Sequence, residues 1–179
     1  MQYRITALLS LLLAACTSQQ RQPAFDVPAA VGALNAELES FANASNLSNS
    51  RFEIHGDCQT ILVTRWSTQA ASRKGFASAR TEVPVNFSTV RAIDFSGPRS
   101  VADARGVQSL DAGIRMDFLV AGVRMKTTAV LASNSQERSA EFETDFVEIS
   151  VAQDATAADA SVRSLMTKLR EVQTACKAR

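Results

Sequence analysis

Histidine and cysteine, the residues that most often bind transition metals, are scarce in this chain. The 179-residue sequence holds one histidine, His55, and three cysteines, Cys16, Cys58 and Cys176. A structural zinc site normally needs three or four such ligands, so we expect neither a metal centre nor another cofactor. The sequence also has no Gly-x-Ser-x-Gly segment, no glycine-rich loop between a strand and a helix, and no His-x-x-Glu metal motif. We therefore expect a protein that is not an enzyme.

The chain also lacks an excess of one charge. Nineteen lysines and arginines stand against eighteen aspartates and glutamates, which gives a formal net charge of +1. A chain this close to neutrality does not require nucleic acid or an acidic surface as its partner, and we expect no nucleic acid. Hydrophobic residues make up 46% of the sequence, a share that suits a packed core and excludes a disordered chain.

The N-terminal apolar run is too short to cross a membrane. It extends from Ile5 to Ala15, about eleven residues, whereas a transmembrane helix needs roughly twenty. One basic residue, Arg4, precedes the run, and two alanines end it. This order of charge, short apolar run and small residues predicts a secretory signal peptide over residues 1–15.

The residues that close this run, Leu13-Ala14-Ala15-Cys16, resemble the lipobox of bacterial lipoproteins. The resemblance implies that the Cys16 thiol receives a diacylglyceryl group, that the chain is cut before Cys16, and that the new amine is often acylated. The alternative is an ordinary signal peptide with a chance cysteine at its cut site. Residue 17 is threonine rather than aspartate, which in proteobacterial lipoproteins favours the outer membrane. We expect anchoring in the bacterial cell envelope through Cys16, with the domain in the periplasm.

Residues 16–27 are polar and lack periodicity, so they are predicted to be a flexible tether that reaches about 35–40 Å when extended. Residues 28–179 then form a single domain, a length that one hydrophobic core can serve. If Cys16 carries lipid, Cys58 and Cys176 remain in an oxidising compartment. We expect one disulfide between them.

An amphipathic helix is predicted at each end of the domain. The first begins at Pro28, and the polar run 43–50 ends it. Its apolar face consists of Val31, Leu34, Leu38 and Phe41. The second helix follows residues 156–159, which fit a capping box. Its apolar stripe consists of Val162, Leu165, Met166, Leu169, Val172 and Cys176.

Strand patterns fill the chain between the two helices, with a clear period of two over residues 114–120 and 123–131. Ala121-Gly122 is predicted to be a tight hairpin turn between these two strands. Pro84 restricts its strand to a sheet edge or a strand start. In the last strand, about 140–151, the apolar parity changes near Phe146, which predicts a bulge or a bend from one sheet to another.

The segment 67–81 is small, polar and basic, and is predicted to be the longest loop of the domain. It holds Arg73, Lys74 and Arg80 and no acidic residue. These side chains could contact an anionic partner, such as lipid headgroups or an acidic protein surface; the alternative is a solvated loop. Trp66, next to this segment, is predicted to be a core residue.

Two other clusters have plain structural interpretations. His55-Gly56-Asp57-Cys58 brings together histidine, aspartate and cysteine, but a Cys–His nucleophile pair needs a free thiol. We expect a turn beside a disulfide there. Four carboxylates on the last strand are expected to form a solvated, charged sheet face. They are Glu141, Glu143, Asp145 and Glu148.

This order of elements predicts an α+β fold: an antiparallel sheet or small barrel of about six to seven strands, with an N-terminal helix and a long C-terminal amphipathic helix. Over residues 52–177 the order resembles PH-like small barrels, in which a C-terminal helix plugs the end of two nearly orthogonal sheets. PH-like domains mostly bind peptides, proteins or lipid headgroups. The alternative fold is an open sheet with two helices on one face.

Two functions remain for such a domain. The first is a non-enzymatic, lipid-anchored module that binds or scaffolds other envelope proteins. The second is a carrier of a lipid or other apolar ligand in the envelope. A carrier needs apolar side chains around an empty interior, whereas a scaffold has a filled core.

Overall fold

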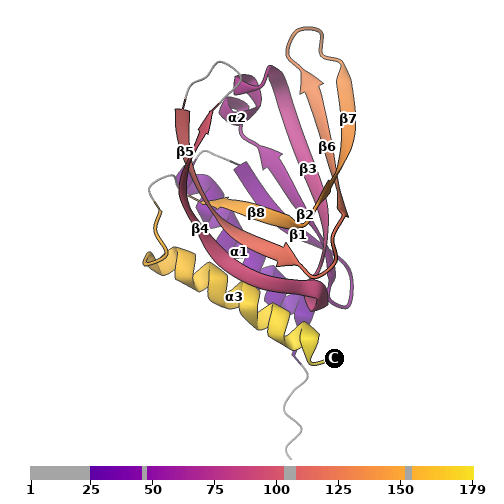
Figure 1. Ribbon diagram of the computed structural model, residues 1–179, viewed down its shortest axis with the longest axis vertical. Helices are drawn as coiled ribbons and strands as arrows, with labels where there is room; N and C mark the ends of the chain where they lie inside the picture. Colours follow the sequence, from indigo (N-terminus) through magenta and orange to yellow (C-terminus); the bar gives the residue numbers. More distant parts are fainter. Residues whose placement is uncertain (1–24, 46–47, 103–107, 152–154) are drawn as a thin grey trace, which may run out of the picture.

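The computed structural model describes residues 25–45, 48–102, 108–151 and 155–179. The predicted signal peptide, Cys16 and nearly all of the tether therefore lie outside the described residues. The fold is α+β, with a long helix at each end of the domain and eight strands in two antiparallel sheets (Figure 1). Among the described strands no pairing joins the two sheets into a closed barrel. The predicted α+β class is thus confirmed in its open form, but the described strands number eight rather than six to seven and form two sheets rather than one.

The chain passes through α1 (Val27–Ser45), β1 (Ser48–Gly56), β2 (Gln59–Trp66), the short helix α2 (Thr68–Arg73), β3 (Phe76–Asn86), the 3₁₀ turn η1 (Phe87–Thr89), β4 (Val90–Ala102), β5 (Gln108–Phe118), β6 (Val123–Leu131), β7 (Glu137–Thr144), β8 (Phe146–Val151) and α3 (Ala160–Lys177). The larger sheet has the order β1-β2-β3-β6-β7, and the smaller sheet has the order β4-β5-β8. All strand pairs are antiparallel.

The helix α1 buries the apolar face that the sequence predicts. Val31, Leu34, Leu38 and Phe41 are all buried. The helix begins one residue before Pro28, and just upstream Asp26 Oδ1 accepts a hydrogen bond from the Ala29 N–H at 3.1 Å. This bond satisfies one of the N–H groups that the first turn of a helix leaves unpaired.

The helix α3 buries the predicted stripe, with Met166 only half-buried. Its start differs from the prediction because the helix begins at Ala160, after residues 156–159. The Thr156 N–H donates to Asp159 Oδ2 at 2.8 Å, and the Ala158 N–H donates to Thr156 Oγ1 at 3.3 Å. These bonds close a turn that leads into the helix, so the predicted capping box lies one turn too early.

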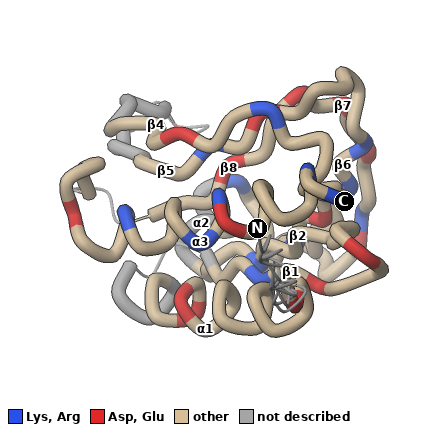
Figure 2. Tube along the Cα trace, turned by 90° about the horizontal axis from the view of Figure 1, so that it is seen from below, with Lys and Arg blue, Asp and Glu red and all other residues tan. Residues whose placement is uncertain are grey.

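The two long helices bridge the two sheets through packing contacts. The helix α1 packs on β1, an edge strand of the larger sheet, and α3 packs on β4, an edge strand of the smaller sheet. The helices also contact each other, and Lys168 of α3 forms an ion pair with Glu37 of α1. The core fills the space between the helices and the parts of both sheets beside them (Figure 1). Seen from the helix side, acidic and basic residues are interspersed along the chain (Figure 2).

Two predicted connections are wrong. The residues Ala121-Gly122 do not turn between paired strands, because β5 pairs with β4 and β8 while β6 pairs with β3 and β7. The chain here crosses from the smaller sheet to the larger one. The segment 67–81 is not a long loop, because it contains α2 and the first half of β3.

Two other strand predictions are correct. The parity change near Phe146 marks a change of sheet, because β7 belongs to the larger sheet and β8 to the smaller one. Pro84 lies on β3 opposite Ile61 of β2, but β6 pairs with β3 only from Phe76 to Glu82. On the β6 side, therefore, β3 is an unpaired edge at Pro84, the kind of position where proline is tolerated in a sheet.

Candidate binding groove between the sheets

A groove of about 380 Å³ lies between the two sheets, toward the α2 end of the molecule. Its lining comes from β2, β3, β6, β7, β8 and the residue after α2. The lining residues are Thr64, Trp66, Lys74, Thr81, Val83, Met125, Thr144, Phe146, Val147, Glu148 and Ser150. A volume of this size is within the usual range for small-molecule sites, about 300–1,000 Å³.

The strand β8 separates the groove from the core. Ile149 and Val151 are buried in the core and do not line the groove, whereas Phe146, Glu148 and Ser150 line it; Val147 is a core residue that also borders the groove. This division follows from the two-residue period of a strand. Glu148 lies against Gly113 of β5, where an added Cβ atom would come within 2.5 Å of Glu148 Cγ. The glycine therefore leaves room for the Glu148 side chain beside the groove.

A row of hydroxyl groups crosses the inner face of the larger sheet. Ser50, Thr64, Thr81 and Thr127 are paired in register on β1, β2, β3 and β6. Ser50 Oγ lies 2.9 Å from Thr64 Oγ1, and Thr81 Oγ1 lies 3.3 Å from Thr127 Oγ1. The neighbouring pair in register, Leu62 and Val83, is buried in the core. The inner face of the larger sheet thus changes from apolar side chains at Leu62 and Val83 to hydroxyl groups at Thr64 and Thr81. A hydroxyl group can both donate and accept a hydrogen bond.

Trp66 forms the aromatic wall of the groove. Its Nε1–H donates to Thr81 Oγ1 at 3.1 Å, and its ring meets Phe76 edge-on with centroids 6.5 Å apart. Lys74 Nζ lies 5.2 Å from the centroid of the indole ring. Trp66 is half-buried and lines the groove, so its predicted place in the core is wrong. The ring is held in one orientation, which suits a surface that a ligand can pack against.

A second aromatic ring stands on the β8 side of the groove. Arg115 Cζ lies 3.8 Å from the centroid of the Phe146 ring, and Arg115 Nε donates to Asp117 Oδ1 at 2.7 Å. The groove therefore combines aromatic and aliphatic surface, hydroxyl groups, a lysine and a carboxylate. This lining suits a ligand with an apolar part and a polar or charged part.

Two of the predicted basic residues, Lys74 and Arg80, face opposite sides of the larger sheet. Lys74 lines the groove, whereas Arg80 alternates with the groove residue Thr81 along β3 and therefore faces the other side of the sheet. Arg80 Nη2 is 2.6 Å from Glu82 Oε1. Arg73 is the last residue of α2, and its side chain lies outside the described part of the structure. Contact with an anionic partner stays a prediction, and Lys74 is the residue placed to make it in the groove.

Cys58 and Cys176 lie at disulfide-bonding distance, with their sulfur atoms 2.08 Å apart and their Cα atoms 5.7 Å apart. The bond joins the turn between β1 and β2 to the last turn of α3. A disulfide sulfur is not a thiolate, so Cys58 cannot serve as a nucleophile beside His55. Of the four carboxylates predicted to be solvated, three are exposed; Glu148 is half-buried beside the groove.

The sequence did not reveal the hydroxyl row. Thr64, Thr81 and Thr127 lie far apart along the chain, and only the strand register aligns them. One signal for it was available in the sequence. Thr81 lies two residues before the apolar Val83, and residues two apart lie on the same face of a strand.

Within the described ranges, no three metal-ligating side chains lie close enough to hold an ion. None of the described helices combines the length and the apolar character needed to span a membrane. Compared with known proteins, the chain matches no protein-family model, no curated protein and no solved structure, so the function proposed below rests on its own residues.

Proposed function

We propose that the protein is a lipid-anchored, non-enzymatic binding module of the bacterial cell envelope, held in the outer membrane by lipid on Cys16. Its domain faces the periplasm and binds another envelope component in the groove between the sheets. The lipobox Leu13-Ala14-Ala15-Cys16 supports the anchor. The groove, with Trp66 held in place beside Lys74, is the single observation that carries the binding role.

The second candidate is a carrier of a lipid or other apolar ligand. Trp66, Met125 and Phe146 favour it, because they give the groove an apolar wall. A carrier, however, encloses its ligand in an empty interior. Here the space between the helices and the sheets is occupied by side chains with no exposure, including Leu34, Phe87 and Ile114. The filled core and the groove beside it support a binding module over an enclosing carrier.

One crosslinking experiment tests the site and separates the two candidates. Trp66 is replaced in cells by the photoreactive amino acid p-benzoylphenylalanine, which is also a large aromatic side chain. A matched variant carries the same amino acid at Glu39, an exposed residue of α1. After irradiation, the binding module predicts a protein adduct from position 66 that position 39 does not give.

Adducts are identified by mass spectrometry. A lipid adduct at position 66 would support the carrier instead of the binding module. Equal labelling at positions 66 and 39, or no adduct at position 66, would contradict a binding role for the groove.

A further inference from the structure

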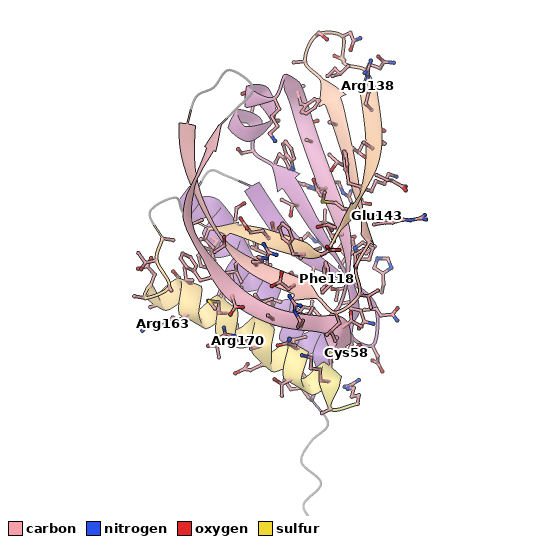
Figure 3. The ribbon with its side chains drawn as sticks, viewed as in Figure 1. Cys58, Phe118, Arg138, Glu143, Arg163 and Arg170 are labelled. Carbon is pink, nitrogen blue, oxygen red and sulfur yellow. A yellow bond between two sulfur atoms is a disulfide. The ribbon has the colours of Figure 1, made fainter. Side chains whose placement is uncertain are left out.

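Side chains from the two long helices cap one edge of each sheet. On β1, Asn35 of α1 donates from Nδ2 to the Phe52 carbonyl at 2.8 Å and accepts the Phe52 N–H on Oδ1 at 2.7 Å. On β4, Arg170 donates to the Ile93 carbonyl at 2.6 and 3.2 Å, and Gln173 Nε2 donates to the Val90 carbonyl at 2.7 Å (Figure 3 labels Arg170). Capping of this kind keeps edge strands from pairing with other chains.

The edge strand β7 has no such cover from the described elements. It ends the larger sheet, and β6 is the one described element with which it makes extensive contact. The residues from Glu137 to Glu143 are all exposed. Figure 1 shows β7 at the outer margin of the molecule, and Figure 3 labels Arg138 and Glu143 there. An uncovered edge offers a row of backbone N–H and C=O groups to an incoming strand.

Charges alternate in sign across the outer face of the larger sheet toward this edge. Glu82 of β3 pairs in register with Lys126 of β6, which pairs with Glu141 of β7. Two residues along, Arg124 pairs with Glu143. Opposite charges on directly paired residues stabilise a sheet, and like charges destabilise it. If another strand were added beside β7, the residues opposite Glu141 and Glu143 should therefore be basic.

On the inner face of β7, between Glu141 and Glu143, the exposed side chain is apolar. Phe142 pairs with Met125, which lines the groove, yet Phe142 is 53% exposed. A strand added beside β7 would place one residue next to Phe142, between the two residues that meet Glu141 and Glu143. An apolar residue there would remove the Phe142 ring from water.

A second copy of the chain does not fit this edge. Glu137, Glu141 and Glu143 share one face of β7. When two β7 strands pair antiparallel about a two-fold axis, every register centred on a residue from Ser139 to Phe142 sets a glutamate of one copy opposite a glutamate of the other. The tether of the chain does not fit either, since residues 17–24 hold one basic residue, Arg21.

We propose that β7 is a docking edge for an extended segment of a partner protein with the sequence pattern basic–apolar–basic. The segment adds to the larger sheet as a sixth strand, hydrogen-bonded through its backbone to β7. Its basic residues lie opposite Glu141 and Glu143, and its apolar residue covers Phe142. Backbone bonds give such a complex its affinity, and the alternating side chains give it specificity.

Fluorescence anisotropy with synthetic peptides tests the proposal, using the full exported protein in detergent micelles. The probe is a labelled ten-residue peptide of serine and threonine with a central Lys-Val-Lys. The matched control has the same composition with a central Lys-Lys-Val. We expect the first peptide to bind roughly tenfold more tightly, because only its charges share one face of a strand. Every second amide N–H of the bound peptide would point toward β7. N-methylation of these amides should abolish binding, because it removes the donors of the hydrogen bonds to β7.

Charge reversal in the protein identifies the edge. Glu141→Lys with Glu143→Lys should abolish binding of the Lys-Val-Lys peptide and create binding of a Glu-Val-Glu peptide, which also shows that the variant is folded. The matched control, Glu39→Lys with Glu171→Lys, makes the same change in net charge at exposed residues of α1 and α3 and should bind like the unchanged protein. Equal affinity for the two lysine peptides, no binding of either, or equal losses in both variants would overturn the proposal. So would dimerisation of the protein through β7.

Discussion

At the scale of single residues, Asn35 takes the place of a strand backbone at the edge of β1. Its amide makes two hydrogen bonds to the main chain of Phe52, whose side chain is buried. Asn35→Ala removes both bonds and leaves a partly buried N–H and C=O without partners. We expect the free energy of unfolding in urea to fall by about 1–3 kcal/mol, the usual cost of such groups.

The control for this prediction lies on the same helix. Ser40 donates a hydrogen bond to the Glu37 carbonyl at an exposed position, so Ser40→Ala should change stability by less than about 0.5 kcal/mol. Equal effects of the Asn35 and Ser40 substitutions would show that the bonds to Phe52 add little.

Residue roles could be predicted from the sequence where the signal is local. The apolar face of α1 follows from a spacing of three and four residues, which Val31, Leu34 and Leu38 display directly. Asn35 has the same local appearance as any polar residue beside that face. Its function depends on Phe52, seventeen residues further along the chain, and on the way that α1 lies against β1. Trp66 was misplaced for the same reason, because the strands around it decide its exposure.

At the scale of elements, the disulfide fastens α3 to the turn between β1 and β2. It closes a segment with a sequence separation of 118 residues, which limits the freedom of the unfolded chain. Replacing both Cys58 and Cys176 by alanine should lower the free energy of unfolding by about 2–5 kcal/mol. Denaturation in urea measures the loss, and mass spectrometry of unreduced peptides detects the bond. Two alkylatable thiols in the native exported protein would contradict the prediction.

Strand burial was easier to predict than strand pairing. The parity change near Phe146 could be read from the sequence because each side of it shows a separate apolar face, and the chain does change sheet there. The turn chemistry of Ala121-Gly122 was misleading because pairing depends on distant strands. The strand β5 lies between β4 and β8, and β6 lies between β3 and β7, so each has both neighbours already. The first half of β3 escaped notice because its inward residues include Ala79 and Thr81, which are not strongly apolar.

At the scale of the whole molecule, the proposed lipid on Cys16 would determine where the domain is held. If the lipobox is read by the export machinery, Cys16→Ser should leave an uncut or soluble precursor and abolish labelling with a fatty-acid analogue. Separation of inner and outer membranes should place the unchanged protein in the outer membrane, since Thr17 stands where aspartate would retain it. If the Cys16→Ser protein were still labelled and still associated with membranes, the proposal that the protein is a lipoprotein would be wrong.

The first described residue, Phe25, lies at the end of the molecule opposite the groove. Arg179 Nη2 donates to the Phe25 carbonyl at 2.8 Å, so the start of the described domain lies beside the end of α3. The groove lies toward α2, at the other end of the molecule (Figure 1). With lipid on Cys16, the helix end should face the membrane and the groove should face the periplasm.

Trp66 can report this orientation because it is the one tryptophan in the chain and lines the groove. We expect iodide in the buffer to quench its fluorescence. Phospholipids brominated on their acyl chains should not quench it, because they act only on groups within the bilayer. The lipidated protein is measured in vesicles of brominated and of ordinary phospholipid, and the Cys16→Ser protein in buffer provides the unanchored reference. Strong quenching by the brominated lipid would place the groove against the membrane, and would favour a carrier that takes lipid directly from the bilayer.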